Sequence, residues 1–103
     1  MKLLKPGLRL KSAVCTTEVM LIRAPSIEAE LACGGVEMIA MGETAPAAAT
    51  LDAALAGGSL IGKRYVDAAD RLEVLCTKGG DGSLALDGVA LAVKQAKPLP
   101  SSD

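Results

Sequence analysis

Residues 27–33 alternate apolar and acidic side chains almost without interruption. Successive side chains of a β-strand point to opposite faces, so the apolar residues would share one face and Glu28 and Glu30 the other. The Gly34–Gly35 pair that follows permits positive φ angles and a tight turn. This pattern predicts a strand with one face in a core and the other in water, followed directly by a turn.

Other short segments with strand character recur along the chain, separated by turn signals that contain glycine or proline. We expect strands in residues 8–13, 18–24, 36–41, 59–66, 72–76, 84–86 and 89–93. The glycine-rich residues 78–82 are expected to join a hairpin. The predicted fold class is mainly β, as a small barrel or a two-layer antiparallel β domain with one short helix or Ala-rich insertion.

The alanine-rich residues 43–58 differ from this pattern. Thr44 can cap a helix, Pro46 suits a first turn, and the glycine pair at 57–58 suits a helix end, which together predict one short helix. A flexible Ala-rich linker is the alternative. A chain of 103 residues is long enough for one domain. We place a single β-rich domain in residues 1–93, with the insertion at 43–58, and an extended tail in residues 94–103.

Composition excludes several classes of function. The chain has no histidine, which removes Ser-His-Asp and Cys-His catalysis and points to a protein that is not an enzyme. Its net charge is −1 with no basic block, and Tyr65 is the single aromatic residue, so nucleic acid binding is not expected. No apolar run is long enough for a membrane helix, so we expect no membrane insertion and a cytoplasmic location.

Half of the residues are hydrophobic, a large share for so small a domain. Some of that apolar surface is therefore expected to be covered by a second copy or by another protein. This predicts a homo-oligomer or a complex with a protein partner.

The three cysteines are the main candidates for chemistry. An odd number fits reduced thiols better than a disulfide framework. Cys15 and Cys33 stand at the two ends of a predicted hairpin-like unit, whereas Cys76 lies in an apolar strand and is expected in the core. A tetrahedral thiolate site needs four ligands. For Cys15 and Cys33 we keep three interpretations open: buried structural cysteines, metal ligands, or a reactive thiol.

The sequence VCTTEV…ELACGGVEM in residues 14–38 resembles the desulforedoxin-type rubredoxin-like domain, which is also the N-terminal domain of desulfoferrodoxin. Cys15 matches the first cysteine of the family's CxxC pair, and Cys33 matches the second cysteine of its CC pair, with Gly34 and Met38 in the following CGxxM pattern. The resemblance implies an Fe(Cys)4 centre and a tendency to dimerise. Glu18 and Ala32 stand where the other two ligands would be, so the metal site is degenerate.

Three functions follow as hypotheses. The first is a small non-enzymatic interaction or accessory protein, self-associating or a subunit of a larger assembly, without a cofactor. The second is a thiolate metal-binding protein, with iron or zinc at Cys15 and Cys33, that transfers electrons or is stabilised by the metal. In that case two copies would pool four thiolates, or Glu18 would join as an oxygen ligand. The third is a small β-barrel that binds an apolar ligand.

Two further patterns favour surface roles. Residues 57–63 match GxxxxGK, but Arg64 follows where a phosphate loop needs serine or threonine, so we expect Lys63 and Arg64 to be a solvated pair. The spacing of the carboxylates predicts no catalytic acid–base pair, and we expect them on solvated faces. They are Glu28, Glu30, Glu37, Asp67, Asp70 and Glu73.

Overall fold

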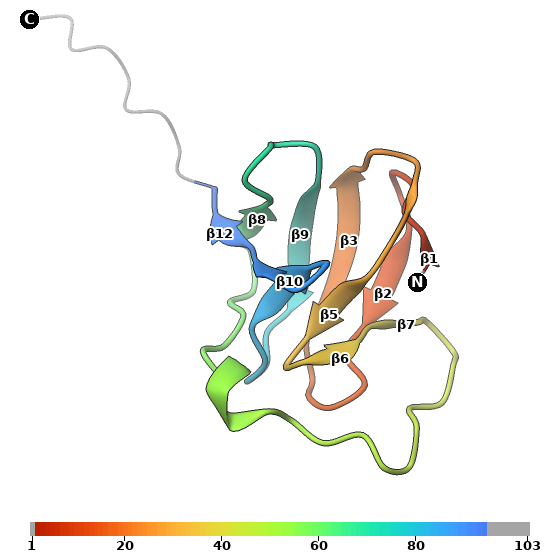
Figure 1. The fold of residues 1–103 in the computed structure, drawn as a ribbon, viewed down its shortest axis with the longest axis vertical. Coiled ribbons are helices and arrows are strands. Elements are labelled where there is room, and N and C mark those ends of the chain that lie inside the picture. The colour runs from red at the N-terminus through yellow and green to blue at the C-terminus, as the bar shows by residue number, and fades with distance from the viewer. Residues whose placement is uncertain (1, 95–103) are drawn as a thin grey trace, which may run out of the picture.

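The structure is a computed structural model, and it describes residues 2–94. A six-stranded sheet forms one layer, and a four-stranded sheet lies across its face (Figure 1). The order in the larger sheet is β12 (Ala92–Val93), β8 (Arg64–Val66), β9 (Glu73–Lys78), β3 (Glu18–Arg23), β2 (Arg9–Lys11) and β7 (Ile39–Ala40). The smaller sheet runs β11 (Val89–Ala90), β10 (Leu84–Leu86), β5 (Leu31–Cys33) and β6 (Val36–Glu37).

The predicted fold class is confirmed, because residues 2–94 are mainly antiparallel β-structure. The sheets of this part do not close into a barrel, so the layered alternative describes them. A third, two-stranded sheet pairs β1 (Lys2–Leu3) with β4 (Glu28–Ala29). The tail predicted for residues 94–103 lies outside the described residues, except Lys94, whose N–H donates to the Arg64 carbonyl at 2.7 Å.

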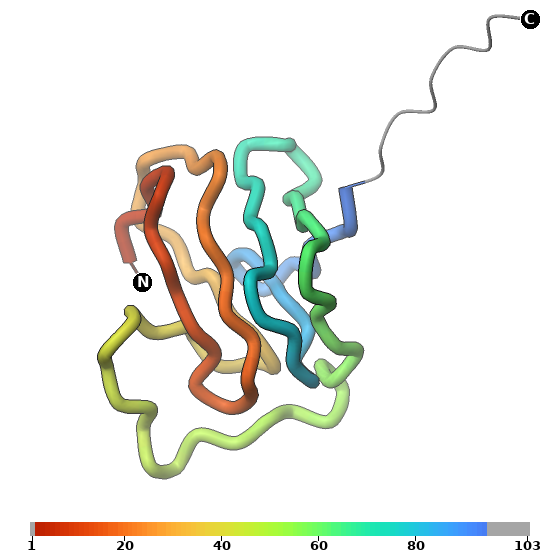
Figure 2. The backbone as a smooth tube through the Cα atoms, turned by 180° about the vertical axis from the view of Figure 1, so that it is seen from behind, coloured from red at the N-terminus to blue at the C-terminus, as the bar shows by residue number. Residues whose placement is uncertain are grey.

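Of the two alternatives for residues 43–58, the Ala-rich insertion describes the segment, because no α-helix forms there. Within the segment the only helical element is the 3-10 turn η1 (Ala53–Leu55), capped by Asp52, whose carboxylate accepts the Ala54 N–H at 2.9 Å. The segment otherwise runs along one end of the molecule between β7 and β8 (Figure 2). Its last residues bond to the turns that flank the smaller sheet, for example from the Asp52 N–H to the Gly34 carbonyl at 3.0 Å. The tertiary hydrogen bonds of the segment lie in residues 52–58, whereas in residues 44–51 the Ala49 N–H bonds locally to the Pro46 carbonyl at 3.0 Å.

Three segments predicted as single strands each divide between two sheets. Residues 27–33 leave the two-stranded sheet after β4 and enter the four-stranded sheet as β5. Glu30 lies between these two strands, and its backbone N–H donates to the carboxylate of Asp87 at 2.8 Å. Residues 36–41 divide in the same way at the buried Met38, and residues 89–93 divide at Leu91. The predicted hairpin at residues 78–82 is also wrong, since it connects β9 and β10, which belong to different sheets.

The strand pairing reveals an internal duplication. Leu10 pairs with Val19 as Tyr65 pairs with Val74, so equivalent residues of β2–β3 and β8–β9 lie 55 positions apart. The four-stranded sheet repeats with an interval of 53, since Leu31 is equivalent to Leu84. The sequence carries the same signal, as EVML at 18–21 matches EVLC at 73–76 and LACGGV at 31–36 matches LALDGV at 84–89.

The two halves are therefore related by an approximate twofold rotation. Equivalent strands meet antiparallel at the centre of each sheet, β3 beside β9 and β5 beside β10. We call residues 2–40 the first half and residues 59–93 the second half. The backbone hydrogen bonds agree: the Gly7 N–H donates to the Leu21 carbonyl at 2.7 Å, and the Gly62 N–H to the Cys76 carbonyl at 2.9 Å. Figure 2 shows the two central hairpins side by side.

The core lies between the two large sheets and is almost entirely aliphatic. Cys76 is part of it, as expected. The other buried members are Leu4, Leu10, Val19, Leu21, Ala29, Leu31, Cys33, Met38, Tyr65, Leu72, Val74, Leu84 and Leu86.

Of the six carboxylates expected on solvated faces, Glu73 departs furthest, while the Asp67 side chain is 10% exposed and Glu37 is partly buried. Glu73 is only 2% exposed. Arg64 and Lys94 enclose it at 3.1 Å and 2.8 Å. Burying a carboxylate costs free energy unless it is paired, and these two cations supply the pairing. The Lys94 ammonium first, and then Arg64, hold the pKa of this carboxyl below its ordinary value. Lys63 and Arg64 are both exposed, as expected, and Arg64 in addition belongs to this ion triad.

Candidate thiol site

The turn between β2 and β3 brings Cys15 against Cys33, the last residue of β5. Their Sγ atoms are 3.7 Å apart. The two cysteines named from the sequence thus meet in space although 18 positions separate them. Cys76 has a different partner, because its Sγ lies 3.2 Å from the Lys78 carbonyl oxygen.

Ser12 orders the turn and faces the sulfur of Cys15. Its Oγ accepts the backbone N–H groups of Val14 and Cys15, each at 3.1 Å. Because these two donors occupy the oxygen lone pairs, the hydroxyl proton is free to point at Cys15 Sγ, which is 3.2 Å away. Ser12 can therefore donate a hydrogen bond to a thiolate.

Two more groups surround the same sulfur. The buried Thr17 places its Oγ1 3.3 Å from Cys15 Sγ, and the Gly82 N–H donates to that sulfur at 3.4 Å. Burial raises the pKa of the Cys15 thiol, but the surrounding hydrogen bonds outweigh burial and lower the pKa from 9.0 to about 7. Since the thiolate is the nucleophilic form, Cys15 is the reactive member of the pair at neutral pH.

Cys33 has the opposite character. It is 0% exposed, and burial is the main cause that raises its pKa from 9.0 to about 11. The negative charge of a Cys15 thiolate adds to this rise, while the hydroxyls of Thr17 and Ser12 oppose it. The site therefore pairs a partly exposed, ionisable sulfur with a buried, protonated one.

A glycine from the second half allows this close packing. A Cβ atom at residue 82 would lie 2.7 Å from Cys33 Sγ and 2.9 Å from the Gly34 nitrogen. A Cβ at Gly80 would lie 2.5 Å from Thr17 Oγ1. Side chains at either position would displace the groups around the sulfurs. The thiol site, which we define as Ser12, Cys15, Thr17, Cys33 and Gly82, is thus built by both halves.

A surface cavity of about 280 Å³ opens onto Cys15. Cys33 is not among its lining residues, so an external molecule meets Cys15 first. The strands supply three charged side chains to the lining, in the cross-strand order Lys11, Glu18, Lys78. The rest of the lining is Ser12, Thr16, Thr17, Ile39 and Ala45.

The residues of one chain do not fit the four-thiolate centre that the family resemblance implies. Within residues 2–94, no three histidine, cysteine or acidic side chains gather in a way that could hold a metal ion. Glu18 shares the cavity with Cys15 but pairs with Lys78 at 3.8 Å. The separation of 3.7 Å between the sulfurs does match two ligands on a tetrahedral ion with metal–sulfur bonds of about 2.3 Å. Metal binding at Cys15 and Cys33 therefore remains a prediction.

Sequence reasoning named both cysteines but missed the groups that tune them. Ser12, Thr17 and Gly82 carry no motif of their own. The internal repeat could have pointed to Gly82. With the interval of 53 residues, Gly82 is equivalent to Ala29, and each stands two residues before a strand of the smaller sheet. A glycine where the other half has a buried side chain indicates close approach of another group.

No family model, no curated protein and no solved structure matches this chain in the three comparisons made. Among residues 2–94, no helix has the length and apolar character needed to cross a membrane.

Proposed function

We propose that this protein carries out thiol–disulfide exchange through Cys15 and Cys33. The single observation that carries the proposal is the pairing of a cavity-lining sulfur with a buried sulfur 3.7 Å away. A disulfide bond is about 2.05 Å long, so modest side-chain movements would close it. Cys15 acts as the attacking thiolate, and Cys33 acts as the resolving thiol. The partner molecule is a disulfide presented at the cavity.

The exchange balances in two steps. The Cys15 thiolate attacks one sulfur of an external disulfide, so a mixed disulfide forms while the external S–S bond breaks and releases a first thiolate. Cys33 then loses its proton to that departing thiolate and attacks Cys15 Sγ. The mixed disulfide breaks and releases the second thiolate, and a Cys15–Cys33 disulfide remains. The protein is oxidised by two electrons, and the external disulfide is reduced to two thiol groups.

The test uses the reduced full chain and bis(2-hydroxyethyl) disulfide as a neutral oxidant. Mass spectrometry should show the loss of two hydrogens, and peptide mapping should join Cys15 to Cys33. The Cys33→Ser variant should stop at the mixed disulfide on Cys15, because it lacks the resolving sulfur. The Cys76→Ser variant is the matched control and should form the same Cys15–Cys33 bond as the unmodified chain.

Two outcomes would contradict the proposal. One is a chain whose Cys15 and Cys33 both remain free after excess oxidant. The other is freshly purified protein with stoichiometric zinc or iron that is lost on Cys33→Ser, which would support the metal site instead. Elemental analysis before oxidation separates this outcome from simple lack of reactivity.

We propose self-association as a second candidate role, in line with the accessory function expected from composition. Leu60 and Ile61 are 61% and 69% exposed on the turn that precedes β8. The equivalent residues of the first half are Lys5 and Pro6, so the apolar pair is particular to the second half. A second copy that covers this turn would remove both side chains from water. Native mass spectrometry should show a dimer that the double variant Leu60→Ser, Ile61→Ser dissociates, and a monomer at micromolar concentration would contradict this role.

A further inference from the structure

We infer that the thiol site prefers small disulfides that carry a carboxylate, bound through Lys11. This inference rests on the exchange reaction proposed above and names its substrate class. The observation that carries it is a lysine, Lys11, that lines the cavity into which Cys15 opens and that forms no ion pair within the described part of the chain.

The cross-strand register fixes the charges around the cavity. Lys11 of β2 stands opposite Glu18 of β3, and Glu18 stands opposite Lys78 of β9. Glu18 forms its ion pair with Lys78 at 3.8 Å. Glu18 therefore neutralises Lys78, and the charge of Lys11 is left over in the lining. When Cys15 ionises, Lys11 is the cation that offsets the thiolate and is available to an incoming carboxylate.

Lys11 is also partly shielded from water. Its side chain is half-buried, whereas the Lys78 side chain is 60% exposed. Ile39 of β7 is its register partner on the other side and lines the same cavity. A carboxylate near Lys11 would gain attraction from a charge that is partly shielded from water, where ion pairs are stronger than at an open surface.

The size of the cavity sets the class of molecule. About 280 Å³ lies at the lower limit of small-ligand sites, which suits a disulfide with short arms rather than a folded protein surface. The sulfur that Cys15 attacks and the carboxylate that Lys11 binds must then both fit within this cavity. A short aliphatic disulfide with terminal carboxylates meets both conditions.

The experiment compares three short disulfides that differ in charge. They are the dianion 3,3′-dithiodipropionate, the neutral bis(2-hydroxyethyl) disulfide and the dication cystamine. The rate of Cys15–Cys33 oxidation is measured by mass spectrometry at pH 7 and low salt, and each rate is divided by that of free 2-mercaptoethanol with the same oxidant. A Cys15 thiolate alone would favour the dication, so the expected preference for the dianion has the opposite sign.

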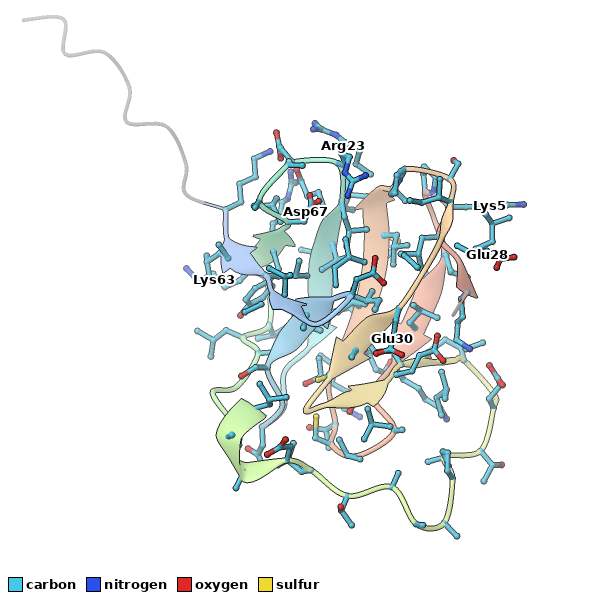
Figure 3. All side chains as sticks on the ribbon, in the orientation of Figure 1. Lys5, Arg23, Glu28, Glu30, Lys63 and Asp67 are labelled. Carbon is cyan, nitrogen blue, oxygen red and sulfur yellow. The ribbon has the colours of Figure 1, made fainter. Side chains whose placement is uncertain are left out.

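We expect the corrected rate for the dianion to exceed that for the dication by about fivefold, the upper end of what one solvent-exposed ion pair contributes. The preference should shrink in 0.5 M salt, because the Debye length falls to about 4 Å there. Lys11→Gln should abolish it. Lys63→Gln is the matched control and should leave it intact, since Lys63 is not among the cavity-lining residues and lies near β8 (Figure 3).

The result that overturns this inference is equal or reversed preference while the neutral disulfide still oxidises the pair. A preference that survives Lys11→Gln would also overturn it. If no disulfide in the series joins Cys15 to Cys33, the exchange reaction itself fails, and that outcome is distinct from a failure of charge selection.

Discussion

The turn at residues 12–17 and the turn at residues 67–72 are equivalent in the approximate twofold, yet they carry different chemistry. The two turns lie at opposite ends of the molecule (Figure 1). Figure 3 labels Asp67, the first residue of the turn at residues 67–72. Both begin with a polar acceptor, Ser12 or Asp67, that binds backbone N–H groups of its own turn. The shared requirement is structural, because each tight turn exposes N–H groups that need a partner.

What differs is the residue that the turn presents and what packs against it. Cys15 corresponds to Asp70, and its partner Cys33 corresponds to Leu86. Gly82 lies over the sulfurs, while its equivalent Ala29 keeps a buried side chain. Duplication supplies one framework twice, and a few substitutions at one end change a packed turn into a thiol site. The following predictions test whether that distinction is real, from the largest effect to the smallest.

The largest difference is expected between the two sulfurs of the thiol site. With pKa values of about 7 and about 11, half of Cys15 but roughly one part in 10⁴ of Cys33 is thiolate at pH 7. Iodoacetamide should therefore modify Cys15 on the order of 10³-fold faster, as measured by peptide mass spectrometry. The Cys15 rate should rise with pH, reach half of its maximum near pH 7 and level off by about pH 9. Comparable rates at both sulfurs would show that the turn does not tune Cys15.

The strand content could be predicted from sequence because alternation and turn residues are local signals. The points at which a segment passes from one sheet to another could not be predicted, because they depend on distant groups. At Glu30, between β4 and β5, the backbone N–H bonds to the carboxylate of Asp87 instead of to a neighbouring strand. Similarly, Thr44 and Pro46 carry local helical signals, but the segment forms only the 3-10 turn η1, beside which the Asp52 N–H bonds to the distant Gly34 carbonyl.

The thiol site could be predicted only in part. Cys15 and Cys33 stood out because they flank one unit of the predicted sheet. The opposite shifts of their pKa values depend on burial and on Gly82, which comes from the other half of the chain. No local pattern around residue 15 reports a backbone N–H that arrives from 67 positions away.

The next largest effect is expected from adding one methyl group at the glycine that covers the sulfurs. Gly82→Ala would place a Cβ against Cys33 and the Gly34 backbone, which overpacks the site and should cost about 2–3 kcal/mol in urea unfolding. The reciprocal change in the other half, Ala29→Gly, should cost about 1 kcal/mol. Gly57→Ala is a matched control, because its Cβ would meet only the hydroxyl of Ser83. Equal small effects at residues 82 and 29 would mean that the site tolerates a side chain there.

A smaller effect is expected from removing the acceptor of either turn. Ser12→Ala and Asp67→Ala should each cost about 1–2 kcal/mol, because each leaves two backbone N–H groups without their acceptor. Only Ser12→Ala should also raise the pH midpoint of Cys15 alkylation, since its hydroxyl favours the thiolate. An unchanged midpoint would assign the lowered pKa of Cys15 to Thr17 and Gly82 alone.

The stability effect of one of these two variants, Asp67→Ala, should also depend on pH. Burial opposes ionisation of Asp67, but the N–H groups of Leu72 and Arg71 and the Arg71 charge lower its pKa below 3.8. A carboxyl whose pKa is lowered by folding stabilises the protein above its unfolded pKa. The stability difference between Asp67→Ala and the unmodified chain should therefore be full near pH 6 and decrease as the pH falls through the folded-state pKa. Ser12→Ala has no carboxyl to lose and should not follow this curve between pH 6 and pH 3.

The smallest effect is expected at Asp70, the residue that occupies the position of Cys15. Asp70 pairs with Arg23 at 3.5 Å, but both side chains are more than half exposed, so water and salt screen the attraction. Asp70 has a positive φ of 56°, which asparagine also tolerates, so Asp70→Asn removes the charge without backbone strain. Its cost in urea unfolding should stay below about 0.5 kcal/mol. A larger cost would show that the turn at residues 67–72 depends on the charge of Asp70. The position shared by Cys15 and Asp70 would then be constrained in both halves, and a cysteine could not be accepted there without a loss of stability.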